Sequence, residues 1–230
     1  MKRWSVLVTA FFLPAALVFF ILGTNTRIIA AQIDRNLDQL VKSQLVKSQL
    51  DMVADNPKKA MSSNPYDYVV DNANYRNIVN LDYQALPILR DKIANSATNG
   101  LKEYIMAIAA EEIAKVDLKG SNFQWVNAKQ WVKVWDNHLR SIPNNVQVIV
   151  ASDSSNQEKV TRLVQLGVPA IPFIMDQVEQ GNTVLSPALS ELLKGSNRVT
   201  VDKNQDIIAW VKENKGRFSD LRMMVDNAQK

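Results

Sequence analysis

The stretch LGVPAIPFI at residues 166–174 decides how this chain folds. Gly167 follows an apolar run with helical spacing, and glycine is favoured just past a helix end because it accepts a left-handed backbone. Pro169 and Pro172 come next, and proline is tolerated in the first turn of a helix, where the amide has no intrahelical partner. Apolar side chains then recur every three or four residues as far as Val178. The stretch therefore predicts that one helix ends, the chain turns tightly and a second helix begins.

A related pattern occurs 85 residues earlier in the chain. When residues 79–81 are aligned on 164–166, identical residue types coincide: Ala85, Pro87 and Asp91 meet Ala170, Pro172 and Asp176. A gap within residues 95–102 changes the offset to 79, which brings Trp131-Val132-Lys133 onto Trp210-Val211-Lys212. These matches predict an internal duplication, with units at about residues 76–146 and 156–226.

Each unit is expected to consist of helices. Helical periodicity predicts them at residues 88–93, 104–116 and 125–139, and again at 171–178, 185–192 and 207–215. Ser155 and Glu158 have the spacing of a capping box at the start of a further helix. Residues 146–150, VQVIV, are the strand-like run, with an extended connector as the alternative. We therefore expect an all-α protein with a compact domain over residues 66–230.

Residues 79–116 and 164–195 resemble HEAT-type helical repeats. The similarity rests on LGVPAIPFI as the start of one helix and on residues 185–195 as its partner. The resemblance implies pairs of antiparallel helices that stack and bind other proteins, without catalytic residues of their own. Two repeats are fewer than a solenoid normally needs. We therefore expect the additional tryptophan-bearing helices to cap a compact, HEAT-like domain.

The amino terminus carries an apolar segment. Residues 4–23 contain no charged side chain and would span about 30 Å as a helix. This length favours an uncleaved signal anchor over a signal peptide, whose apolar region is usually about 7–15 residues. Lys2 and Arg3 precede the segment, which puts the amino terminus in the cytoplasm and the domain outside it. We expect a single-pass membrane protein with residues 1–31 as anchor; the alternative is cleavage near Ala31 and secretion.

Residues 32–65 are expected to form a helical stalk and a linker. Ile33, Leu37 and Leu40 lie at helical spacing in a stretch without glycine or proline. The pentapeptide VKSQL, repeated over residues 41–50, rotates the apolar stripe and argues against a regular coiled coil. Turn signals within residues 56–65 mark the linker. We expect a solvated stalk that also packs on the domain, with a partner- or membrane-binding helix as the alternative.

Composition excludes several classes of chemistry. The chain of 230 residues has no cysteine and one histidine, His138, which leaves no thiolate, disulfide or Cys–His metal site. The net charge of +4 is scattered along the chain, so no nucleic-acid partner is expected. The seven glycines form no phosphate-binding loop. We expect no metal and no cofactor.

Acidic residues offer the remaining route to catalysis. Glu111 and Glu112 are adjacent on a predicted helix, where their side chains point about 100° apart and cannot share one site. Asp153 lies in a predicted capping turn. We therefore expect no catalytic residue and a non-enzymatic protein; the alternative is a cell-wall-associated hydrolase that uses Asp or Glu.

Trp125 and Trp135 are the candidate partner-binding residues. Trp131 matches Trp210 in the duplication and is expected in the core, whereas the counterparts of Trp125 and Trp135 are asparagines. An unmatched tryptophan is a candidate for an exposed contact because tryptophan often anchors interfaces; the alternative is packing within the domain. The expected function is a membrane-anchored, extracytoplasmic scaffold that binds an unknown protein or cell-wall partner.

Overall fold

The computed structural model describes residues 25–43, 45, 64–120, 125–202 and 205–230. Within those ranges the regular structure is helical and no strand occurs, so the predicted all-α class is confirmed. After an amino-terminal helix at residues 25–43, the α-helices are α2 (Ala73–Val79), α3 (Leu86–Asn95), α4 (Leu101–Ala114), α5 (Ala128–Ala151), α6 (Asn156–Gln165), α7 (Ile171–Glu179), α8 (Ser186–Leu192), α9 (Ile207–Asn214) and α10 (Ser219–Ala228). Short 3-10 helices precede or join them: η2 (Pro65–Tyr68), η3 (Asp82–Ala85), η4 (Val168–Ala170), η5 (Thr183–Leu185) and η6 (Lys215–Phe218).

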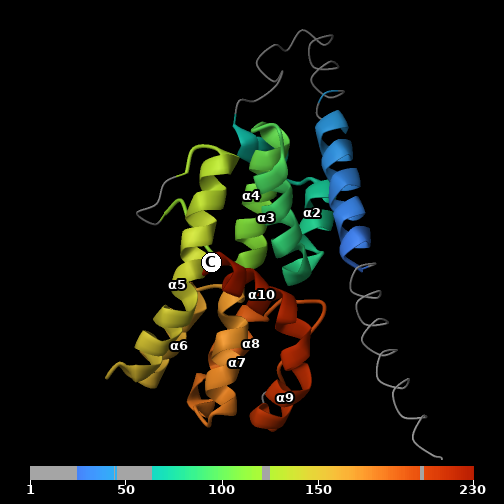
Figure 1. The fold of residues 1–230 in the computed structure, drawn as a ribbon. Coiled ribbons are helices and arrows are strands. Elements are labelled where there is room, and N and C mark those ends of the chain that lie inside the picture. Colours follow the sequence, from blue (N-terminus) through green and yellow to red (C-terminus); the bar gives the residue numbers. More distant parts are fainter. Residues whose placement is uncertain (1–24, 44, 46–63, 121–124, 203–204) are drawn as a thin grey trace, which may run out of the picture.

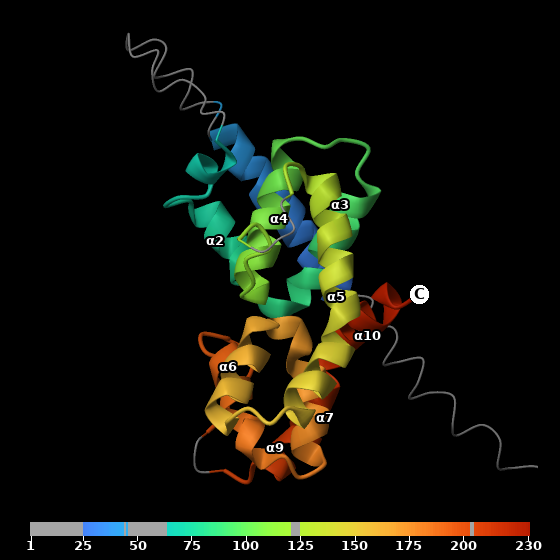
Figure 2. The same ribbon diagram turned by 90° about the vertical axis from the view of Figure 1, so that its left-hand side faces the viewer.

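The helices are arranged in two halves that are stacked end to end (Figures 1 and 2). The amino-terminal helix, α2, α3 and α4 form one half, and α6 to α9 form the other. Helix α5 runs along both halves, and α10 packs against α5 near the level where the halves meet. Because the halves share these two helices, their buried apolar side chains form one continuous core.

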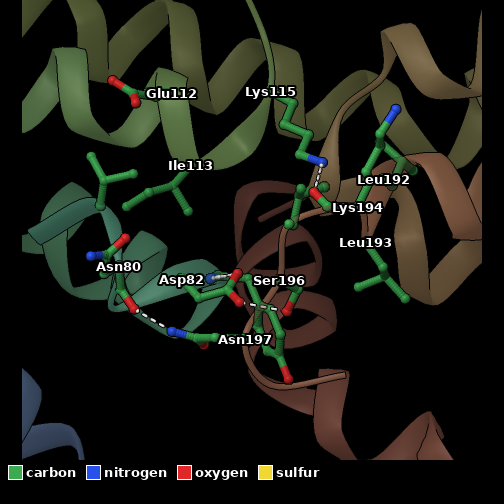
Figure 3. Close-up of a pocket in the computed structure, with 14 residues that line it drawn as sticks. Asn80, Asp82, Glu112, Ile113, Lys115, Leu192, Leu193, Lys194, Ser196 and Asn197 are labelled. Atoms are coloured by element: carbon green, nitrogen blue, oxygen red, sulfur yellow. Dashed lines mark hydrogen bonds between the residues drawn. The ribbon is translucent and has the colours of Figure 1, made fainter. Parts of the chain in front are cut away.

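Polar contacts join the two halves beside this core (Figure 3). Lys115, just past the end of α4, donates hydrogen bonds through Nζ to the main-chain oxygens of Glu191 at 3.1 Å and Lys194 at 2.7 Å. Glu191 lies at the end of α8 and Lys194 two residues beyond it, and the Glu191 oxygen also accepts the backbone N–H of Lys194 at 3.3 Å. Ser196 Oγ donates a hydrogen bond to Asp82 Oδ2 at 2.5 Å. The contacts surround a cavity of about 130 Å³, and we assign this seam a structural role.

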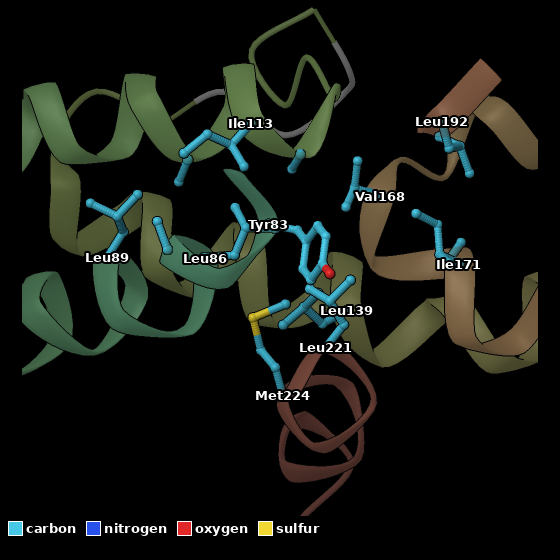
Figure 4. Close-up of a cluster of buried hydrophobic side chains, with 14 of the residues drawn as sticks. Tyr83, Leu86, Leu89, Ile113, Leu139, Val168, Ile171, Leu192, Leu221 and Met224 are labelled. Atoms are coloured by element: carbon cyan, nitrogen blue, oxygen red, sulfur yellow. The ribbon is translucent and has the colours of Figure 1, made fainter. Parts of the chain in front are cut away.

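The turn at residues 166–174 lies at the centre of the molecule. Helix α6 ends at Gln165, Gly167 adopts a φ of 78°, and η4 leads into α7, as the sequence predicts. Val168 and Ile171 are buried in the core where side chains of both halves meet (Figure 4). Figure 4 places them near side chains from four other elements: Tyr83 of η3, Leu139 of α5, Leu192 of α8 and Leu221 of α10.

The strand-like run at residues 146–150 is instead the end of α5, so the expectation of a strand or extended connector was wrong. Val146 and Ile149 are buried, whereas Val148 between them is 52% exposed. This spacing of three residues continues the inward face of the helix from Ile142. The β-branched side chains favour a strand locally, but burial of one helical face outweighs that preference.

The amino-terminal helix is part of the folded domain. It buries Ile29, Ile33, Leu37 and Leu40, and Ile33 and Leu40 have no exposed surface. Its polar side pairs with the neighbouring helices: Asp34 with Lys92 of α3 at 2.7 Å, and Asp38 with Lys102 of α4 at 2.5 Å. This part of the predicted stalk therefore packs on the helices of the domain.

The predicted membrane span and the predicted linker involve residues that the structure does not describe. The apolar run at 4–23, the second VKSQL copy at 46–50 and the linker before residue 64 lie outside the described residues. Among the helices that are described, none is long and apolar enough to cross a membrane.

Candidate functional site

Trp125 and Trp135, the candidate partner-binding residues, lie in the interior. Their exposed fractions are 1% and 0%, so neither presents a surface to a partner in this conformation. The ring of Trp135 stacks on that of Trp131, with 5.2 Å between centroids, and Trp125 packs on Tyr104 at 4.7 Å. The structure therefore agrees with the alternative, packing within the domain, and the predicted burial of Trp131 is confirmed.

A half-buried carboxylate, that of Glu111, holds the indoles of Trp125 and Trp131. Glu111 Oε1 accepts hydrogen bonds from the indole N–H groups of Trp125 at 2.7 Å and Trp131 at 3.0 Å. Its Oε2 accepts the backbone N–H of Leu118 at 3.3 Å. Burial raises the pKa of Glu111, and the hydrogen bonds from the indoles partly oppose that rise. Glu111 therefore joins α4, the loop after it and α5.

The other side chains considered as catalytic or metal-binding candidates do not share a site with Glu111. Glu112 points away from Glu111, as predicted, and accepts hydrogen bonds from Tyr75 at 2.6 Å and Arg76 at 2.5 Å. His138 Nε2 lies 3.0 Å from the main-chain oxygen of Leu166, and burial lowers the pKa of its imidazole. Across the described ranges, no group of three or more His, Cys, Asp or Glu side chains is placed to hold a metal.

A groove of about 670 Å³ opens between the amino-terminal helix, α3, α5 and α10. This volume is typical of sites that accommodate ligands or anchoring side chains. The apolar part of its lining comes from Ile29, Pro87, Ile88, Leu139, Met223, Met224 and Ala228, and uncharged polar side chains come from Asn25, Thr26, Gln84 and Asn227. Met223 is 55% exposed at its surface. Methionine is flexible and polarisable, so the two adjacent methionines can adapt to an irregular apolar surface.

Charged side chains form the rim of the groove. Arg90 holds Asp136 with two hydrogen bonds, of 3.0 Å from Nε and 2.7 Å from Nη2, and donates a third to Asp91 at 3.0 Å. The bonds to Asp136 raise the pKa of the guanidinium group. The rim carries three acidic and three basic side chains: Asp91, Asp136, Asp220, Arg90, Arg140 and Lys230. The balance favours a partner without a large net charge over a strongly charged ligand.

Sequence reasoning missed both the groove and the role of Glu111. The groove is built from four helices that are distant in sequence, and only the pair Met223-Met224 hints at an adaptable surface. Glu111 lies seven residues after Tyr104, on the same face of α4. An acidic residue on the face that carries an aromatic side chain was a signal for an internal hydrogen-bond acceptor.

Comparison of the chain with protein-family models, with curated proteins and with solved structures finds no match.

Proposed function

We propose that this chain is a membrane-anchored, non-enzymatic domain that binds a protein partner outside the cytoplasm through the groove. The observation that carries the proposal is the groove itself, with its apolar lining, exposed Met223 and charge-balanced rim. An apolar floor surrounded by charges is typical of a surface that receives an amphipathic segment. We propose that an amphipathic helix of the partner occupies the groove, because the groove is bordered by helices against which such a helix can pack.

The proposed membrane anchor lies close to the groove along the chain. Asn25 and Thr26 line the groove, and Asn25 follows the apolar run at residues 4–23 after one intervening residue. Two residues extend the chain by at most about 7 Å, so a span that ends at residue 23 would hold the groove close to the membrane surface. The partner would then be a protein that meets this domain at the membrane.

The amino-terminal helix favours the anchored form over the secreted one. The helix continues without interruption past Ala31, the residue near which cleavage would occur. Cleavage there would divide a folded helix, remove the buried side chain of Ile29 and delete Asn25 and Thr26 from the groove. The secreted form would therefore have a smaller core and an incomplete groove.

We also propose that the two predicted units, at about residues 76–146 and 156–226, are related and of HEAT-like type. Helices α3 and α7 each follow a 3-10 helix, and each has a proline as its second residue, Pro87 or Pro172. With the offset of 79, α5 aligns with residues 207–230, a range that contains α9, η6 and α10. Helix α5 therefore corresponds to a helix that is interrupted in the second unit.

The groove can be tested with the substitution Met223→Arg. Met223 is 55% exposed, so the change is expected to alter the free energy of unfolding by less than about 0.5 kcal/mol while placing a long cation across the groove. A photo-crosslinking residue at position 88 in the native host should identify the partner segment. A synthetic peptide of that segment should then bind the Met223→Arg chain at least about tenfold more weakly than the unchanged chain.

The matched control is Val184→Arg, which changes a 52% exposed apolar residue in η5, away from the groove. It should leave peptide affinity unchanged. Equal affinity of the unchanged chain and the Met223→Arg chain for the peptide would contradict the groove as the binding site.

The topology can be tested with a reporter fused after Lys230. A reporter that is active only outside the cytoplasm should be active, and the fusion should remain in the membrane fraction after a high-salt wash. Substitution of Leu13 and Leu17 by Arg, within the apolar run, should release the protein from that fraction because charged residues at the centre of a span are costly. Reporter activity confined to the cytoplasm would contradict the proposed orientation.

A cell-wall hydrolase remains the second candidate, because three aspartates line the groove: Asp91, Asp136 and Asp220. Two of them accept hydrogen bonds from Arg90, an arrangement that suits a structural ion pair better than a general acid. Polymer hydrolysis that disappears in a folded Asp220→Asn variant would favour this candidate over the scaffold.

A further inference from the structure

Three aromatic rings surround the ammonium group of Lys119. Its Nζ lies 5.1 Å from the ring centroid of Tyr66, 4.8 Å from that of Tyr104 and 4.3 Å from that of Trp125. The rings come from η2, from α4 and from the residue that lies just before the N-cap region of α5. Tyr66 and Tyr104 meet edge to face, with an interplanar angle of 84°, so the rings enclose the cation from different directions. Lys119 Nζ also donates a hydrogen bond to Tyr104 Oη.

The rings of Tyr66, Tyr104 and Trp125 form an aromatic cage, and the electrostatics of this cage favour a cation. The faces of aromatic rings are negative, and a cation within about 6 Å of a ring centroid is attracted to it. The indole N–H of Trp125 donates to Glu111 at 2.7 Å, and a carboxylate in this position increases the electron density of the ring and places an acidic group behind it. Glu111 therefore strengthens the ring nearest to the Lys119 ammonium.

A short turn at residues 117–120 positions Lys119 in the aromatic cage. Asp117 Oδ1 accepts the backbone N–H groups of Lys119 at 3.1 Å and Gly120 at 2.8 Å. Among the described residues, the contacts of the Lys119 ammonium group are with the aromatic side chains and not with a carboxylate. Tyr66 is 40% exposed, so the cage reaches the surface. A lysine held by aromatic rings and one tyrosine hydroxyl, without a carboxylate partner among the described residues, can be displaced by a cation that the rings bind better.

We propose that Tyr66, Tyr104 and Trp125 form a binding site for a quaternary ammonium group, and that Lys119 is its built-in competitor. A primary ammonium is strongly hydrated, and its transfer into an aromatic cage costs part of that hydration. A trimethylammonium group is larger, more weakly hydrated and fills a cage of several rings, which is the common way in which proteins recognise choline-like groups. The site is independent of the groove, and its ligand is a choline-type head group, either free or attached to a lipid.

The test compares the full chain, in a detergent without choline, with its Lys119→Ala variant. Binding of choline is followed by titration calorimetry and by the total tryptophan fluorescence of the chain. We expect the variant to bind choline at least about tenfold more tightly than the unchanged chain, because the competing cation has been removed. We also expect choline to raise the melting temperature of the variant more than that of the unchanged chain.

A neutral compound of the same shape, 3,3-dimethyl-1-butanol, separates charge from apolar contact. It should bind the Lys119→Ala variant at least about tenfold more weakly than choline does. Equal binding of the two compounds, or equal affinity of the unchanged and variant chains for choline, would overturn the proposal.

A second substitution tests the cage itself. Adding Tyr66→Ala to Lys119→Ala should abolish the gain in choline affinity, while Val70→Ala, at a residue that is 63% exposed, should preserve it. Retention of choline affinity without Tyr66, in a double variant that still melts cooperatively, would overturn the assignment. A short-chain phosphatidylcholine that binds more tightly than free choline would identify the lipid as the source of the group, and equal binding would identify the free form; both outcomes support the site.

Discussion

Replacing Gly167 with alanine is expected to lower the free energy of unfolding by about 3–5 kcal/mol. Gly167 has a φ of 78° and a ψ of −179°, a conformation that is nearly restricted to glycine. A Cβ atom there would lie 2.5 Å from the main-chain oxygen of Ala114 and would overlap Cγ1 of Val116. The oxygen belongs to the last residue of α4, so relief of the overlap requires movement of one half of the domain relative to the other. Urea unfolding followed by circular dichroism measures the loss.

Gly195→Ala is the matched control for this prediction. Gly195 also has a positive φ, of 82°, but no atom lies within 4 Å of the position that its Cβ would occupy. It should lose only the cost of a left-handed alanine, about 1–2 kcal/mol. Equal losses in the two variants would show that backbone strain, and not the close approach to α4, explains the requirement for Gly167.

The second large effect is expected for Glu111→Ala, at about 3–5 kcal/mol. The substitution removes the acceptor of three donors: the indole N–H groups of Trp125 and Trp131 and the backbone N–H of Leu118. A donor left without a partner in the interior costs about 1–3 kcal/mol, and the loss is greatest when water cannot enter. Glu213→Ala, at an exposed position of α9, is the control and should change the stability by less than about 0.5 kcal/mol. A loss of that small size in Glu111→Ala would contradict the role of the carboxylate.

The pH dependence of Glu111→Gln gives an independent measurement of the same site. Burial raises the pKa of Glu111 above its ordinary value, so the folded chain binds this proton more tightly than the unfolded chain. The free energy of unfolding therefore falls as the pH rises from the ordinary carboxyl pKa through the raised one. Glutamine has no proton to lose, so the part of the fall that is due to Glu111 should be missing in the variant.

Local sequence signals predicted the elements whose structure depends on local chemistry. Gly167, followed by prolines that a first helical turn tolerates, predicted the central turn, and Ser155 predicted the start of α6, where its Oγ accepts the N–H of Glu158 at 3.3 Å. These features depend on backbone geometry and on hydrogen bonds between near neighbours. Neither needs knowledge of the rest of the chain.

Features that depend on distant contacts could not be predicted in this way. The run at 146–150 has β-branched residues, but α5 continues through it because one face is covered by other helices. Trp125 and Trp135 lack aromatic counterparts in the duplication, yet both are buried, and the indole of Trp125 is held in place by Glu111 of α4. The groove and the aromatic cage likewise combine residues from three or more segments, which a single sequence does not bring together.

The continuity of α5 has a consequence for how the domain unfolds. Its earlier residues pack on α3 and α4, and its later residues pack on α6 and α7. Fraying of either half therefore removes neighbours from the same helix and weakens the other half. In an open solenoid each repeat contacts only the next one, and repeats can melt in succession. Here the shared helix couples the two halves, so heating should produce one endothermic transition without a populated intermediate in which only one half has melted.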